Sequence, residues 1–233
     1  MRTAGALLAA AAGVQAVLVR LGGTLGSTAQ ERAALLPGDD IIASPDAVTN
    51  HAITIDASPE DVWPWLVQMG WHRAGWYTAR WVDLLLFPAN GPSATRILPD
   101  LQGLHVGDFV PDGAPETGCG FVVEQLDPRR ALVLHSTSHV PAAWRERHGA
   151  VLDWSWAFVL HPLDDGRRTR FQVRSRWRTA PWWFTLVGRL AVVPADLLMS
   201  HDMLRGVRTR AEALRTSRAH ARPTAVTKRS TAS

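Results

Sequence analysis

This chain of 233 residues contains almost no cysteine, lysine or tyrosine. Because Cys119 is the single cysteine, an internal disulfide is excluded and the cysteine content indicates no redox compartment. Lys228 is the one lysine among 25 basic residues, and a GC-rich genome produces this bias together with the many alanines. Tryptophan is abundant by contrast, with 11 copies in a chain that is 46% apolar. This length and apolar content suit one domain with appendages.

Two kinds of chemical motif are also absent. The sequence has no glycine-rich loop for phosphate and no closely spaced metal-binding motif. His135 and His139 are four residues apart, but they fall at a strand end and in a loop, where they would not converge as on a helix. Ser136 and Ser138 lie beside them without the motif of a nucleophile elbow. We therefore expect no metal and no cofactor.

The basic residues are concentrated at the two ends of the chain. Residues 205–233 contain eight Arg or Lys and one Glu, and residues 1–36 contain three Arg and one Glu. Since the whole chain carries a net charge of +4, residues 37–204 carry −5. This acidic body lacks the basic groove that nucleic acid requires, so we expect no nucleic-acid partner.

The N-terminal region has an uncharged apolar run from Thr3 to Val19, close to the lower length limit for a membrane-spanning helix. We expect it to be a helix that anchors the protein to a membrane, with no orientation indicated. Three alternatives stay open: a helix packed on the domain, a signal peptide cleaved after Ala29, and a cytoplasmic protein. Thr28 and Glu31 have the spacing of a capping box, which indicates a short helix there.

Composition divides the chain into four parts. We expect an apolar helix over residues 1–27, a short helix and turn-rich linker over 28–46, the main domain over 47–215 and a disordered basic tail over 216–233.

The main domain begins with strand periodicity and then changes to helical periodicity. Ser58 and Pro59 open a short helix after the first strand, and Pro64 bends or shortens it. A second short helix is expected over residues 79–87. Strands are expected over residues 53–56, 108–110, 120–126, 130–135, 152–160 and 169–177, with a hairpin turn at 164–166.

Along the last two strands, aromatic and apolar side chains alternate with more polar ones. Trp154, Trp156, Phe158 and Leu160 share one face of their strand, and Phe171, Val173, Ser175 and Trp177 share one face of the next. Arg170, Gln172, Arg174, Arg176 and Arg178 form the opposite face, which we expect to be exposed to solvent and to pair with Asp153.

The aromatic face requires a cover, and residues 182–215 supply one. Their apolar positions recur close to every 3.6 residues, which predicts a long helix, bent or restarted at Pro194. The fold class is therefore α+β: a curved antiparallel sheet wrapped around a long C-terminal helix, with two short helices after the first strand.

Several stretches resemble a known group of proteins: residues 51–70 (HAITIDASPEDVWPWLVQMG), 73–77 (RAGWY), 97–102 (ILPDLQ) and 203–206 (MLRG). Through these stretches, residues 36–212 are similar to the START-like, or SRPBCC, superfamily, and specifically to its polyketide cyclase/dehydrase-like branch. The resemblance implies the helix-grip fold. It implies less about function, because the superfamily includes lipid carriers, hormone receptors and cyclases.

We expect the chain to bind or carry a small apolar or lipid-like ligand between the sheet and the C-terminal helix. Two alternatives stay open: a cyclase- or dehydratase-type enzyme acting on an aromatic or polyketide-like ligand, and a scaffold with a filled core. No convergent acid/base pair is evident, which favours a binding protein over an enzyme. The candidate acids and bases are Tyr77, His135 and His201. The candidate ligand-binding residues are Trp76, Tyr77, Trp154, Trp156, Phe158, Phe171, Trp177, Met199 and Met203.

Overall fold

The computed structural model describes residues 13, 22–86 and 90–221. The apolar run from Thr3 to Val19 is almost entirely outside this part, and so is the end of the basic tail. Among the described residues no single helix is both long and apolar enough to cross a bilayer. The membrane anchor therefore remains an expectation from the sequence.

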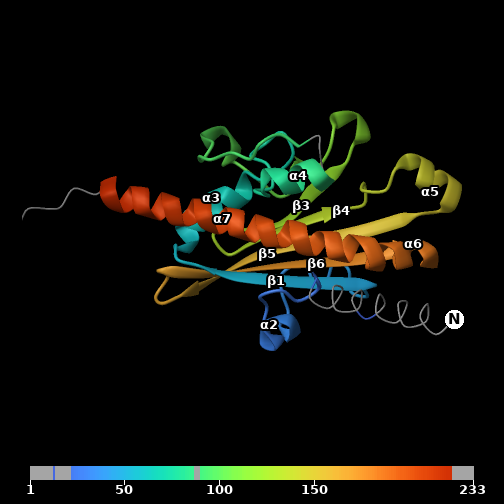
Figure 1. The fold of residues 1–233 in the computed structure, drawn as a ribbon, viewed down its shortest axis with the longest axis horizontal. Coiled ribbons are helices and arrows are strands. Elements are labelled where there is room, and N and C mark those ends of the chain that lie inside the picture. Colours follow the sequence, from blue (N-terminus) through green and yellow to red (C-terminus); the bar gives the residue numbers. More distant parts are fainter. Residues whose placement is uncertain (1–12, 14–21, 87–89, 222–233) are drawn as a thin grey trace, which may run out of the picture.

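The domain is built on one antiparallel sheet of six strands, in the order β1-β6-β5-β4-β3-β2 (Figure 1). The strands are β1 (Ala47–Ile55), β2 (Phe109–Pro111), β3 (Gly120–Asp127), β4 (Ala131–Ser136), β5 (Val151–Leu163) and β6 (Arg168–Ala180). Each expected strand is confirmed, although β1, β5 and β6 are longer than their patterns indicated. The longest pairing joins β5 to β6, where Trp154 lies opposite Trp177 and Leu160 opposite Phe171.

The two short helices expected after the first strand are α3 (Pro59–Val67) and α4 (Arg80–Leu86). Pro64 lies inside α3, which ends three residues later. Ser58 has the extended backbone of an N-cap, but its hydroxyl donates to Asp61 at 3.0 Å instead of accepting from the helix backbone. The sequence did not predict α5 (Ala142–His148), which follows Pro141 and ends at Gly149.

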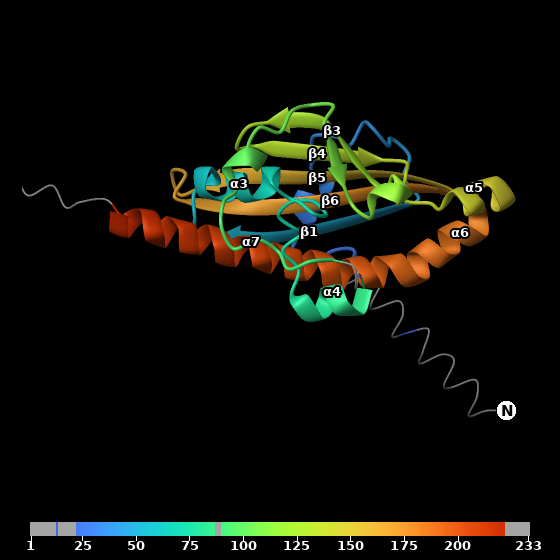
Figure 2. The same ribbon diagram turned by 90° about the horizontal axis from the view of Figure 1, so that it is seen from above.

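The C-terminal segment is helical from Trp182 to Ala221 and packs on the sheet (Figures 1 and 2). It consists of α6 (Trp182–Val187), five π-helical residues (Gly188–Val192) and α7 (Val193–Ala221). A bend of 50° separates Trp182–Leu190 from Ala195–His220, which confirms the break expected near Pro194. α7 continues beyond the expected boundary at residue 215.

Only part of the expected apolar stripe on this segment is buried. Met203, Leu204 and Val207 join the main core, whereas Leu186 and Leu190, which precede the bend, are half-exposed.

Close packing of α7 against the segment around Tyr77 requires a glycine. A Cβ atom at Gly206 would lie 2.0 Å from the carbonyl oxygen of Tyr77, so no side chain fits there.

The arginine face of β6 is covered, which corrects the expectation that it faces solvent. An N-terminal strap, residues 22–46, runs beside β1 and across this face. It begins with backbone bonds from Asn50 N–H to Gly23 and from Ala52 N–H to Leu25, and it includes α2 (Ala29–Ala33) with the expected capping box. A second small core lies beneath the strap, formed by Leu36, Val133, Ala157 and Val159.

Arg174 shows why this face is not exposed. Its guanidinium, with 4% of the side chain exposed, makes five hydrogen bonds: to Asn50, to Asp39 at 2.5 Å and to the carbonyl oxygens of Ala34, Glu31 and Arg32. A buried guanidinium is stable only when its donors are matched in this way. Arg178 alone behaves as expected, since it is exposed and pairs with Asp153 at 3.0 Å.

Glu31 also joins the strap to β6, through Arg170, and this contact makes the stability of the fold depend on pH. The hydrogen bonds from Arg170 are the main cause that lowers the pKa of Glu31 from 4.5 to about 2. A carboxylate whose pKa is lower in the folded state stabilises the fold above its unfolded pKa and loses this effect as the pH falls.

We predict that Glu31→Gln lowers the free energy of unfolding by about 1 kcal/mol at neutral pH. The amide can still cap α2 but cannot pair with Arg170 as an ion. The difference from the unmodified protein should shrink as the pH falls from 4.5 towards 2. Urea unfolding at several pH values in this range measures the difference in free energy of unfolding, and Glu116→Gln, at an exposed glutamate, is the control. A difference that stays constant with pH would contradict the prediction.

Candidate functional site

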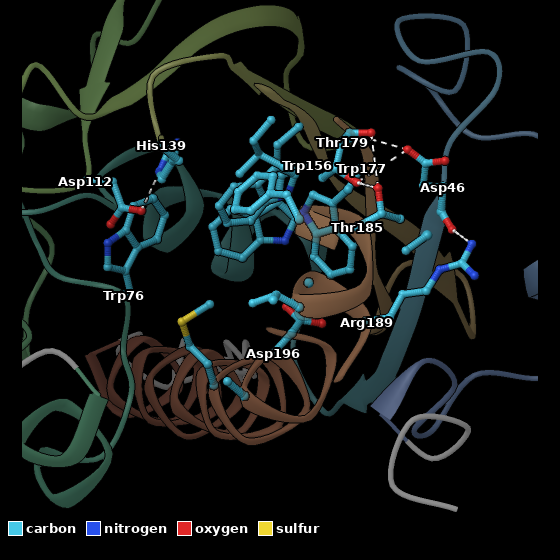
Figure 3. A pocket seen from close by; sticks show the side chains of 18 of the residues that line it. Asp46, Trp76, Asp112, His139, Trp156, Trp177, Thr179, Thr185, Arg189 and Asp196 are labelled. Carbon is cyan, nitrogen blue, oxygen red and sulfur yellow. Dashed lines mark hydrogen bonds and ion pairs between the residues drawn. The ribbon is translucent and has the colours of Figure 1, made fainter. Parts of the chain in front are cut away.

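A cavity of about 220 Å³ lies between the sheet and the C-terminal helical segment (Figure 3). β5 and β6 supply one wall, α6 and α7 another, and the segments around Trp76 and Asp112 close the side. Its surface is mainly apolar. The lining includes four tryptophans, Trp76, Trp154, Trp156 and Trp177, together with Leu152, Phe184, Val187 and Met199.

The four tryptophans form one continuous aromatic wall. Trp154 and Trp156 are stacked with their ring centroids 5.3 Å apart. Trp76 extends the wall from Trp156 at 5.3 Å, and Trp177 extends it from Trp154 at 6.1 Å. The indole N–H groups of Trp76, Trp154 and Trp156 are buried and have no acceptor in the described protein. The cavity is therefore bounded by ring carbon atoms rather than by these donors.

Asp112 and His139 form a polar pair on one side of this wall (Figure 3). Asp112 follows β2 and His139 follows β4, and their Oδ2 and Nε2 atoms are 3.0 Å apart. His139 Nδ1 lies 2.7 Å from the hydroxyl of Ser136, which also accepts the N–H of Ser138. The Ser138 hydroxyl donates to the carbonyl of Gly120 at 2.9 Å, so the network is anchored on β3.

A second carboxylate enters the cavity from α7 (Figure 3). Asp196 lies 3.1 Å from His51 Nε2 on β1 and accepts the Ser200 hydroxyl at 3.0 Å. The side chains of Asp196 and His51 are 2% and 1% exposed. His51 Nδ1 has no hydrogen-bond partner in the described protein. Asp196 thus links the cavity to a buried polar cluster behind it.

Asp46 and Arg189 lie where the lining reaches solvent. The carboxylate of Asp46 accepts the N–H of Thr179 at 2.8 Å, and the exposed Arg189 donates to the carbonyl oxygen of Asp46 at 2.6 Å. Figure 3 shows the Arg189 guanidinium turned towards Asp46. This contact holds the π-helical residues between α6 and α7 against the residue that precedes β1.

The structure divides the ligand-binding residues expected from the sequence into two groups. Trp76, Trp154, Trp156, Trp177 and Met199 line the cavity. The other four are part of the packed core beside it: Tyr77, Phe158, Phe171 and Met203.

None of the three expected acids and bases lines the cavity. The Tyr77 hydroxyl donates to the carbonyl of Trp65 at 2.8 Å, and burial raises the pKa of this phenol well above its usual value, so it stays protonated. His135 points to the opposite side of the sheet and lies 2.7 Å from Asp153. His201 is half-buried on α7.

The sequence did not indicate the acidic residues of the cavity. Asp112 and His139 are 27 positions apart, and His51 and Asp196 are 145 apart, so no local motif joins either pair. One signal was present for Asp196, which is the only charged residue between Arg189 and His201. A single acid within an apolar helical run indicates a specific partner. In the described part of the chain, no three His, Cys, Asp or Glu side chains gather as a metal site would require.

Neither a family model nor a curated protein matches this chain. Several solved structures resemble it. A hypothetical protein from Helicobacter pylori is 13% identical, with 77% of this chain and 96% of that protein covered, at a TM-score of 0.47. Truncated norcoclaurine synthase from Thalictrum flavum is 11% identical, with 68% and 91% covered and a TM-score of 0.36. CalU16 from Micromonospora echinospora is 13% identical, with 72% and 86% covered and a TM-score of 0.32.

The topology of the chain itself establishes its fold. Six antiparallel strands, two short helices after the first of them and a long C-terminal helix packed on the sheet make a helix-grip fold. The helix-grip fold that the sequence resemblance implied is thereby confirmed.

We predict that Trp156→Ala lowers the free energy of unfolding by about 3–5 kcal/mol, because it removes a large packed ring from the wall. Trp156 is 1% exposed and contacts the rings of Trp76, Trp154 and Phe158. The control is Trp182→Ala, since Trp182 is 77% exposed and its loss should cost less than about 0.5 kcal/mol. Chemical denaturation monitored by circular dichroism measures both, and equal losses would contradict the prediction.

Proposed function

We propose that this protein binds and carries a small, mainly apolar ligand in the cavity between the sheet and the C-terminal helical segment. The observation that carries the proposal is the tryptophan wall around a cavity of about 220 Å³. Apolar pockets with a few polar groups are the usual form of small-molecule sites. Three of its four tryptophans, Trp154, Trp156 and Trp177, lie on β5 and β6, so most of its shape is fixed by the pairing of two long strands.

We expect the neutral apolar fluorophore N-phenyl-1-naphthylamine to bind saturably and to quench tryptophan emission. Ala195→Phe should weaken this binding by about tenfold or more, because Ala195 lines the cavity and a ring there fills it without removing any wall residue. Fluorescence titration measures the affinity.

The matched control is Trp81→Ala, which removes a half-exposed tryptophan of α4 outside the cavity and should leave the affinity unchanged. Binding that is not saturable, or that Ala195→Phe does not affect, would support the scaffold alternative instead.

A second candidate function, a cyclase- or dehydratase-type enzyme, is favoured by the Asp112–His139 pair. Proton transfer needs an acid or base at the ligand, and these two residues line the cavity where Tyr77, His135 and His201 do not.

The ligand that stays bound through purification distinguishes carrier from enzyme. For the enzyme, we expect prolonged incubation with the protein to convert this ligand, and His139→Gln to abolish conversion while leaving affinity nearly intact. Mass spectrometry of the extracted ligand measures both. A ligand recovered unchanged from the unmodified protein would contradict the enzyme and support the carrier.

A further inference from the structure

The cavity combines an aromatic wall with carboxylates that have no cationic partner. Asp46, Asp112 and Asp196 contribute three carboxylates to the lining, against one guanidinium, that of Arg189. Arg189 is exposed and donates to the backbone of Asp46, so it lies at the edge of the cavity rather than beside the other two acids. In the described residues, neither Asp112 nor Asp196 is paired with Arg or Lys.

The hydrogen-bond network around His139 leaves the charge of Asp112 in place. The Ser138 hydroxyl is committed to the Gly120 carbonyl, and the Ser138 N–H donates to Ser136. The Ser136 hydroxyl lies within hydrogen-bond distance of both Ser138 Oγ, at 3.1 Å, and His139 Nδ1, at 2.7 Å. Donation to the closer of the two, His139 Nδ1, assigns a neutral imidazole whose Nε2–H donates to Asp112. Asp112 receives a hydrogen bond but no compensating positive charge.

The same argument applies to Asp196. A doubly protonated His51 would bury a charged N–H at Nδ1 with no acceptor, whereas a neutral ring with its proton on Nε2 leaves an unpaired but uncharged acceptor there. Asp196 then accepts from two neutral donors, His51 and Ser200. A carboxylate that is 2% exposed and faces an apolar cavity is costly without a cation nearby.

The tryptophan wall complements these charges. The face of an indole ring carries negative electrostatic potential and attracts organic cations, more strongly than the other aromatic side chains do. The buried indole N–H groups are covered, so a ligand meets the rings through their carbon atoms. An apolar, aromatic cavity whose carboxylates are not neutralised by Arg or Lys favours a cationic ligand.

We infer that the cavity selects an apolar ligand that carries a positively charged ammonium group, with Asp112 and Asp196 as its counter-charges. This inference rests on the proposed function, since it names the chemical class of the ligand that the cavity holds. An anionic ligand of the same shape would be repelled by the same two carboxylates.

Three probes of nearly equal shape test the charge alone. They are trimethylphenylammonium, which is cationic, tert-butylbenzene, which is neutral, and 2-methyl-2-phenylpropanoate, which is anionic. Isothermal titration calorimetry on the full chain measures their affinities. We expect the cation to bind about tenfold or more tightly than the neutral probe, and the anion to bind most weakly.

Substitutions assign the preference to the two carboxylates. Asp112→Asn and Asp196→Asn should each reduce the preference for the cation by about threefold or more, while the affinity for tert-butylbenzene stays nearly constant. Either variant that folds is sufficient, as judged by circular dichroism. Asp165→Asn, at an exposed acid in the β5–β6 turn, is the control and should change nothing. Ala195→Phe should abolish binding of all three probes.

The outcomes separate this inference from the proposed function. Equal affinity for the cation and the neutral probe, or tightest binding of the anion, overturns the charge preference and leaves the apolar site standing. A preference that survives both Asn variants also overturns the assignment to these residues. If none of the three probes binds, the proposed function fails with the inference.

Discussion

The hairpin of β5 and β6 imposes the constraint on which the rest of the structure depends. Its two strands place aromatic side chains on one face and the arginines of β6 on the other, and each face requires its own cover. The C-terminal helical segment covers the aromatic face and leaves the tryptophan-walled cavity beneath it. The N-terminal strap covers the other face and matches the donors of Arg174 with backbone and carboxylate oxygens. Apolar burial thus stabilises one side of the sheet, and hydrogen bonding to charged groups stabilises the other.

Most of the fold could be predicted from the sequence because its signals are local. The alternation from Trp154 to Leu160 indicates a strand, and the recurrence from Met203 to Val207 indicates a helix facing it. The cover over Arg174 could not be predicted in this way. An alternating arginine is the usual sign of a solvent-exposed face, and four of the five hydrogen-bond acceptors of Arg174 lie more than 130 positions away in the strap.

The same dependence on local signals explains which residues of the candidate site could be predicted from the sequence. The tryptophans of β5 and β6 could be identified because strand alternation places them on one face. The acids of the cavity could not, because Asp112 and Asp196 acquire their histidine partners only through tertiary contacts. Packing also separated residues that the pattern had grouped together. Phe158 and Phe171 share the aromatic face but lie beyond the cavity, in the core around α3 and α7.

The strap also determines how mechanical load enters the domain. The chain from Gly23 to Gly26 is hydrogen-bonded along β1, and the following residues are held by Arg170, Arg174 and Arg176 of β6. A force applied to the chain at Gly23 is therefore transmitted to the β1–β6 edge of the sheet and to the arginine contacts together. Tension on the chain at Gly23 thus acts on β1, the strand that holds His51 against Asp196.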